Sequence, residues 1–185
     1  KDKHLLRSYI VAGASPTWWA FIYVYMPIYI IEQGLGVQWV AYFLFAVVVP
    51  ILALEYYLNI LVDKLKYRRP FVQANLCIAL LLVIAFFVPN IYLLMGIIVL
   101  GSIGIAFVEP SAESYFFLIA PKSALERTYS IFNTSLDVFA IIGKLIVAGS
   151  LAILSFEYSF LVLALVFLFF AWVSLSLKQV SGAKD

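Results

Sequence analysis

The stretch SFLVLALVFLFFAWVSLSL, residues Ser159–Leu177, contains no charged residue and decides the fold class. A helix needs about 20 mostly apolar residues to cross the hydrocarbon core of a bilayer, and this run is nearly that long. Its polar and apolar residues do not alternate with a period of two, so a membrane-spanning helix is favoured over a strand of a β-barrel. The stretch therefore predicts an all-α membrane protein.

The composition of the whole chain supports this prediction. Of 185 residues, 65% are hydrophobic and only 12% are charged, and a soluble domain of this size could not bury so much apolar surface. The formal net charge of +2 is too small to indicate a nucleic-acid partner. The only cysteine, Cys77, and the only histidine, His4, exclude an intramolecular disulfide and most metal-dependent or histidine-dependent catalysis. We therefore predict no cofactor, no metal site and no enzyme activity.

Clusters of charges, prolines and glycines divide residues 1–185 into six predicted spans of a single bundle with short connections. The spans are Ser8–Ile31, Trp39–Val62, Phe71–Val88, Tyr92–Leu118, Thr128–Leu154 and Ser159–Leu177. Every Lys and Arg except Lys144 falls at the termini or in alternate loops, on one side of the predicted membrane. The positive-inside rule then predicts cytoplasmic termini, and we expect the plasma (inner) membrane.

Charged residues are distributed unevenly among the spans. The third and sixth spans have none in their interiors, whereas the second, fourth and fifth contain Glu55, Glu109, Glu113, Asp137 and Lys144. Because a charged helix must face protein or water, we expect the third and sixth spans to face lipid. The pattern predicts two groups of three helices. Since three crossings reverse the direction of the chain, the two groups form an inverted repeat, which is common in transporters.

Two connections between the spans carry a family resemblance. Residues Asn59–Arg69, NILVDKLKYRR, resemble the loop between the second and third helices of the major facilitator superfamily, and Asp63, Lys64 and Arg68 match its pattern. Residues Glu113–Arg127, ESYFFLIAPKSALER, are similar to the loop after the fourth helix of the family. The resemblance implies a conformational latch formed by these loops. The latch candidates are Asp63, Lys64, Arg68, Glu113 and Arg127.

Members of this family usually have twelve helices in two six-helix halves, so the resemblance implies that the chain is one half. Asn59 and Lys66 stand where the family prefers glycine, and this loop is typically more eroded in the second half. Together with the basic entry segment and the missing initiator Met, this predicts the C-terminal half. The implied partner is a second six-helix half or a second copy in a homodimer.

Polar and aromatic side chains within the spans are the candidates for substrate or proton coupling. They are Asp137, Lys144, Glu109, Glu55, Trp19 and Tyr23. At about 100° per residue, Asp137 and Lys144 share one helix face, either as a cavity-lining pair or as a self-neutralising structural pair.

For the remaining candidates, the sequence favours different roles. Glu113 is predicted to be structural and paired with Arg68 or Arg127, whereas Glu109, one turn deeper, is a candidate protonation or substrate site. Glu55 is either a coupling residue or a structural carboxyl group. Trp19 and Tyr23 share a helix face and either line a cavity or serve packing.

The sequence thus predicts a secondary transporter that moves a small solute by alternating access and is coupled to protons through a buried carboxylate. The alternative is a non-transporting membrane bundle, either an interaction scaffold or a truncated orphan half, because one half alone has no partner with which to form a central cavity. An intramembrane enzyme is disfavoured because the required nucleophile–base or metal constellations are missing. The absence of a phosphate-binding glycine loop argues against ATP-driven pumping.

Overall fold

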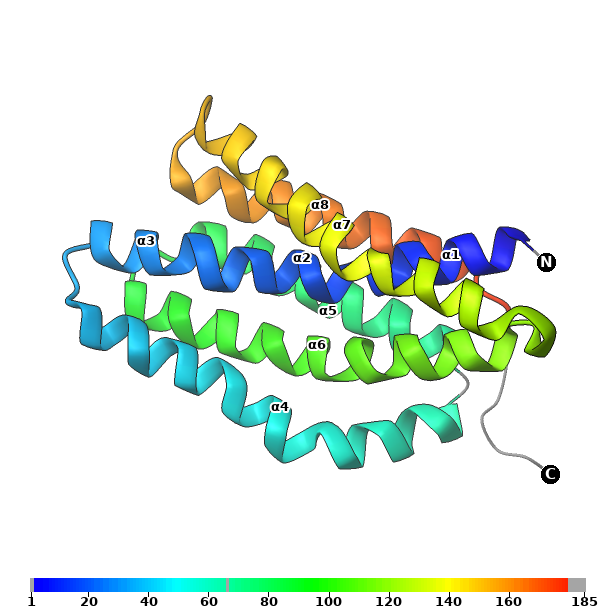
Figure 1. Ribbon diagram of the computed structural model, residues 1–185. Coiled ribbons are helices and arrows are strands. Elements are labelled where there is room, and N and C mark those ends of the chain that lie inside the picture. Colours follow the sequence, from blue (N-terminus) through cyan, green and yellow to red (C-terminus); the bar gives the residue numbers. More distant parts are fainter. Residues whose placement is uncertain (1, 66, 180–185) are drawn as a thin grey trace.

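The computed structural model describes residues 2–65 and 67–179, without the side chains of residues 2, 55, 56, 58, 59 and 61–65. The described part consists of helices joined by short connections and contains no strand, and its long helices lie side by side in one bundle (Figure 1). In chain order the elements are α1 (Asp2–Ala12), α2 (Ala14–Ala20), the π-helical η1 (Phe21–Tyr25), α3 (Met26–Glu32), α4 (Val37–Leu65), α5 (Arg68–Phe87), α6 (Ile91–Ile119), the 3₁₀ turn η2 (Lys122–Ala124), α7 (Leu125–Leu151) and α8 (Phe156–Leu175).

The first expected span, Ser8–Ile31, is not one continuous α-helix. It consists of the elements from α1 to α3 arranged end to end (Figure 1). The interruptions follow from two prolines, because a proline has no N–H to donate to the carbonyl four residues earlier. Pro16 therefore donates no hydrogen bond to the carbonyl of Ala12, the last residue of α1. Pro27 likewise donates none to the carbonyl of Tyr23, which lies in the wider π-helical turn.

Five helices are long and apolar enough to cross a membrane, judged by length and composition among the described residues. They are Val37–Leu54 within α4, then α5, α6, Lys122–Leu151 with α7, and α8. The short elements α1 to α3 run the length of the same bundle (Figure 1). Hydrophobic runs in the sequence thus predict the long helices, whereas the division of the first span depends on where its prolines fall.

Helices α5 and α8, whose charged residues lie only in their first turns, pack most extensively against each other. Half of the residues of α8 are buried (50%), compared with 11% in the Val37–Leu54 segment of α4. The expectation that these two helices simply face lipid was therefore incomplete, because an apolar helix is equally suited to a protein interior. The exposed residues of α8 are nonetheless all hydrophobic, as a lipid-facing surface requires: Tyr158, Leu165, Leu168, Phe169, Trp172 and Leu175.

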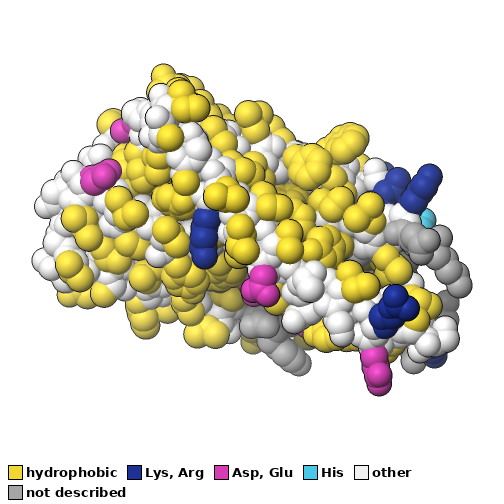
Figure 2. All heavy atoms as spheres, turned by 45° about the horizontal axis from the view of Figure 1, so that its top comes forward, with side chains coloured by type: hydrophobic (Ala, Val, Ile, Leu, Met, Phe, Trp, Pro, Cys, Tyr) yellow, Lys and Arg dark blue, Asp and Glu magenta, His cyan; other side chains and the backbone are white. Residues whose placement is uncertain are grey.

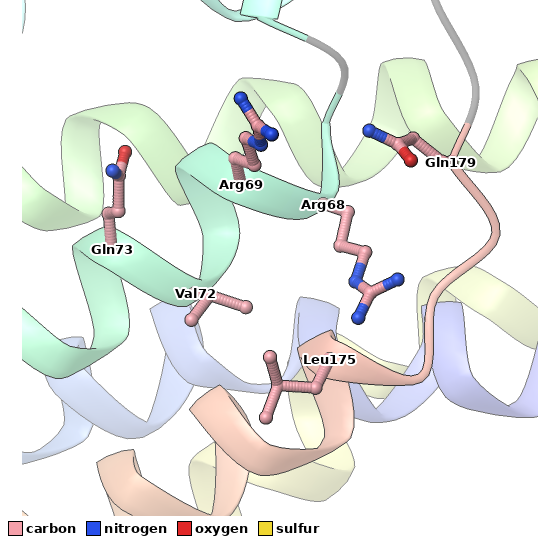
Figure 3. A pocket seen from close by; sticks show the side chains of 6 residues that line it. All are labelled: Arg68, Arg69, Val72, Gln73, Leu175 and Gln179. Atoms are coloured by element: carbon pink, nitrogen blue, oxygen red, sulfur yellow. The ribbon is translucent and has the colours of Figure 1, made fainter.

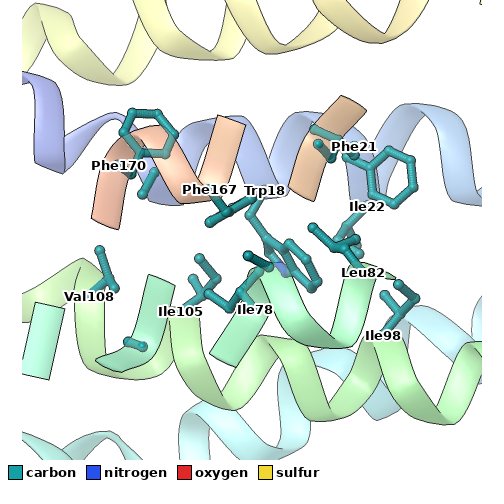
Figure 4. Packing of buried hydrophobic residues seen from close by; sticks show 14 of the residues in the cluster. Trp18, Phe21, Ile22, Ile78, Leu82, Ile98, Ile105, Val108, Phe167 and Phe170 are labelled. Atoms are coloured by element: carbon teal, nitrogen blue, oxygen red, sulfur yellow. The ribbon is translucent and has the colours of Figure 1, made fainter. Parts of the chain in front are cut away.

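The centre of the bundle is filled by Trp18 of α2. Its side chain is 1% exposed and lies edge-to-face against Phe167 of α8, with ring centroids 5.8 Å apart. Figure 4 shows Trp18 among aliphatic residues of α5 and α6. A Cβ atom added to Gly101 of α6 would lie 2.6 Å from the Trp18 ring. The absence of a side chain at Gly101 thus provides the space that this indole occupies.

We expect Gly101→Ala to destabilise the protein by about 1–3 kcal/mol, because the added methyl group overpacks the fully buried ring of Trp18. Thermal unfolding in detergent, followed by near-ultraviolet circular dichroism, measures the change. Gly96→Ala on the same helix is the matched control, since nothing lies within 4 Å of its added Cβ. Equal unfolding temperatures for the two variants would contradict this account of the core.

Candidate functional site

An aromatic pair and a carboxylate meet between α2, η1 and α6. The Trp19 indole Nε1–H donates a hydrogen bond to Glu109 Oε2 at 3.0 Å. Trp19 also stacks on Tyr23, with ring centroids 5.1 Å apart and an interplanar angle of 13°. The sequence predicted that Trp19 and Tyr23 share a face. It gave no signal for the bond between Trp19 and Glu109, because these residues are 90 positions apart.

These three side chains line a cavity of about 490 Å³. The lining residues come from α2, η1, α4 and α6: Trp19, Tyr23, Ile51, Ala106, Glu109, Pro110 and Glu113. Glu109 and Glu113 are four residues apart, so they lie on the same side of α6 one turn from each other. Among the described residues, the lining thus contains two carboxylates and two aromatic rings but no basic side chain. We call it the acidic–aromatic cavity.

Glu113 has a partner that the sequence did not predict. The Tyr129 hydroxyl of α7 donates a hydrogen bond to Glu113 Oε1 at 2.7 Å. Tyr129 is itself held by stacking on Phe117, with ring centroids 5.2 Å apart. The predicted ion pair with Arg68 or Arg127 is not formed in this structure, because neither guanidinium bonds to Glu113 among the described residues. A tyrosine two positions beyond Arg127 in the sequence offered no pattern from which this bond could have been found.

Asp137 and Lys144 lie on α7, away from the acidic–aromatic cavity. The helix is continuous from Leu125 to Leu151, so their predicted spacing of two turns is retained. Both side chains are exposed, and neither forms an ion pair with a described residue. They therefore do not neutralise each other, as the structural alternative required. Figure 2 shows isolated acidic and basic side chains in the middle of a largely hydrophobic face.

The backbone of α7 beside Lys144 is held against the first part of the chain. The Tyr25 hydroxyl donates to the Lys144 carbonyl oxygen at 2.7 Å. At Gly143, an added Cβ would lie 3.1 Å from Thr17 Cα, so the missing side chain allows α7 to approach α2 closely. The backbone on one side of α7 is thus fixed, while the Lys144 side chain is exposed.

The remaining predicted residues are placed as follows. The side chains of Glu55, Asp63 and Lys64 lie outside the described residues. Arg68 begins α5 and Arg127 is exposed in the first turn of α7, and neither reaches the acidic–aromatic cavity. Among the described residues, no group of three or more His, Cys, Asp or Glu side chains is placed to hold a metal ion.

Comparison with protein families completes this description. The family described as the Major Facilitator Superfamily matches residues 8–184. The chain belongs to the major facilitator superfamily. Comparisons with individual curated proteins and with solved structures give no significant match.

Membership in the major facilitator superfamily agrees with the all-helical fold and the apolar helices described above. The protein is therefore an integral membrane protein of a transporter family, and its fold is consistent with half of the superfamily architecture. The family resemblance predicted from the loops is confirmed over almost the whole chain. The superfamily is one of secondary transporters rather than of enzymes.

Proposed function

We propose that this chain is one half of a secondary transporter that moves a small solute by alternating access, with the acidic–aromatic cavity as its solute and proton site. The hydrogen bond from Trp19 to Glu109 carries the proposal. An ionisable residue within a membrane span is costly to retain and is by default a functional candidate. Here the carboxylate is held by an indole at the wall of a cavity large enough for a small molecule.

Proton coupling follows from the charge that Glu109 can lose. When ionised, the carboxylate needs the indole N–H together with water or a cationic solute, which favours an open, wetted cavity. When protonated, it is neutral and can be enclosed at lower cost. Binding and release of a proton at Glu109 would therefore change which closed conformation is stable, as alternating access requires.

The lining of the cavity supports a positively charged solute. Two carboxylates provide the charge to attract it, and the stacked rings of Trp19 and Tyr23 offer π faces that bind cations. None of the described residues that line the cavity is a lysine or arginine that could attract an anion. We therefore propose an organic cation as the solute class.

A second bundle completes the proposed transporter. Asp137 and Lys144 are exposed in the single chain although both lie within a candidate span. Since hydrocarbon cannot accommodate two unpaired charges, we propose that α7 faces a water-filled interior shared with another six-helix half or a second copy. The distribution of Lys and Arg supports cytoplasmic termini in the plasma (inner) membrane.

Thermal stabilisation of the purified protein by a panel of size-matched cations, anions and neutral solutes tests this site. A ligand that binds the folded state raises the unfolding temperature, and the stabilisation grows with the logarithm of its concentration once that concentration exceeds the dissociation constant. We expect organic cations to stabilise the protein and the other two classes to leave it unchanged. Stabilisation by anions would overturn the cationic class, and a protein that binds and moves no solute would favour the scaffold alternative.

Trp19→Phe should weaken binding of a stabilising cation about tenfold, because phenylalanine retains an aromatic face but cannot donate a hydrogen bond to the carboxylate. Titrations of the unfolding temperature against cation concentration give the dissociation constants. Trp39→Phe is the matched control, since Trp39 packs against Tyr42 and Tyr92 and does not line the cavity. Equal loss of affinity in both variants would remove the special role of the Trp19–Glu109 bond.

A further inference from the structure

A second hollow, of about 460 Å³, lies between the start of α5 and the end of α8. Its lining shares no residue with the acidic–aromatic cavity. The lining residues are Arg68, Arg69, Val72, Gln73, Leu175 and Gln179. Figure 3 shows Arg68 and Val72 extending from α5 toward Leu175, with Gln179 alongside. This hollow is therefore a separate feature that the proposed transport site does not use.

The hollow has the chemistry of an anion site. Two guanidinium groups and two amide side chains supply hydrogen-bond donors, and none of the described residues that line it is acidic. Neither Arg68 nor Arg69 forms an ion pair or a side-chain hydrogen bond with a described residue. The first turn of α5 adds the positive end of the helix dipole, and no side chain caps it. Guanidinium groups bind phosphate through paired hydrogen bonds, so an oxyanion of this kind fits the donors.

The end of α8 is fixed in place beside these donors. Arg7 of α1 donates from Nη1 to the Ser176 carbonyl oxygen at 2.8 Å, and the Tyr115 hydroxyl of α6 donates to the Lys178 carbonyl oxygen at 3.2 Å. Leu177 between them is 3% exposed. The wall formed by Leu175 and Gln179 is thus anchored to two other helices.

The surroundings distinguish a lipid from a soluble anion. Val72 and Leu175 give the hollow an apolar side. Exposed apolar residues continue from this apolar side along both helices. On α5, Leu76 and Leu80 lie one and two turns beyond Val72. On α8, Trp172 and Leu168 lie about one and two turns before Leu175. A phospholipid can place its phosphate among the donors and its acyl chains along these two helices, whereas a soluble anion would use only the polar side.

We propose that Arg68, Arg69, Gln73 and Gln179 bind the phosphate of an anionic phospholipid at the junction of α5 and α8. Basic pockets between membrane helices at the cytoplasmic surface bind anionic head groups in this way. The lipid would join the start of α5 to the end of α8, the two helices that pack most extensively in the bundle. This lipid site does not depend on which solute the protein moves or on proton coupling.

Native mass spectrometry of the detergent-purified protein tests the proposal by titration with phosphatidylglycerol and with phosphatidylcholine of the same acyl chains. We expect phosphatidylglycerol to bind more tightly, and Arg68→Gln/Arg69→Gln to raise its dissociation constant about 30-fold, or about fivefold for each arginine. Lys122→Gln/Arg127→Gln is the matched control, because it removes the same charge from exposed residues of another connection. Arg68→Lys/Arg69→Lys should retain most of the affinity.

Three results would overturn the proposal. One is unchanged phosphatidylglycerol affinity in the double glutamine variant, and another is equal binding of the two lipids by the unmodified protein. The third is displacement of phosphatidylglycerol by millimolar inorganic phosphate, which would assign the hollow to a free anion. If the double variant does not fold, the two single glutamine variants test the same expectation.

Discussion

Glu109→Gln should abolish solute uptake driven by a pH gradient, reducing it to the level of protein-free vesicles. Glutamine is close to glutamate in shape and can still accept the hydrogen bond from Trp19, but it cannot bind or release a proton in the physiological range. If Glu109 couples the solute to protons, the variant is fixed in the neutral form and the gradient cannot drive a net cycle. Uptake of a stabilising cation into proteoliposomes with an imposed pH difference measures the effect.

Two comparisons separate lost coupling from lost structure. Exchange of labelled for unlabelled solute at equal pH on both sides needs no net proton movement, so Glu109→Gln should retain it. Glu126→Gln is the control for removing a carboxylate, since Glu126 is exposed in the first turn of α7 and does not line the cavity. Gradient-driven uptake that persists in Glu109→Gln would disprove coupling at this residue and direct attention to Asp137.

The elements of the fold that could be predicted are those determined within one segment. The apolar run of α8 predicts a membrane helix on its own, and the positions of Glu109 and Glu113 on α6 follow from helical periodicity alone. The stacking of Trp19 on Tyr23 is likewise local, because residues four apart lie on one helix face. In each case the responsible physical interaction acts between residues close in sequence.

The contacts that could not be predicted join different helices. The α5–α8 packing was missed because hydropathy does not distinguish a neighbouring helix from lipid, as both are apolar. The bonds from Trp19 to Glu109 and from Tyr129 to Glu113 depend on the relative height and rotation of two helices. The expectation that an arginine would neutralise Glu113 rested on charge and on the family resemblance of the loops, whereas the phenol of Tyr129 donates a hydrogen bond to the same carboxylate.

Cysteines placed at Asp137 and Lys144 should react with a charged, membrane-impermeant thiol reagent at least about 100-fold faster than cysteines placed at Leu165 and Trp172. All four positions are exposed in the single chain, so exposure alone predicts similar rates. The thiolate is the reactive form, and it does not persist in hydrocarbon. In the proposed assembly the charged face of α7 meets water, whereas the uniformly hydrophobic exposed face of α8 meets lipid.

The experiment uses protein in vesicles and a Cys77→Ala background, because Cys77 is itself exposed. Unfolding in sodium dodecyl sulfate should equalise the four rates, which shows that each thiol is present and reduced. Rapid reaction at Leu165 and Trp172 would place α8 against water and reverse the proposed arrangement of the bundle in the membrane. Protection of both α7 positions would show that Asp137 and Lys144 are covered by protein, so that the second bundle would seal this face rather than share a wetted interior with it.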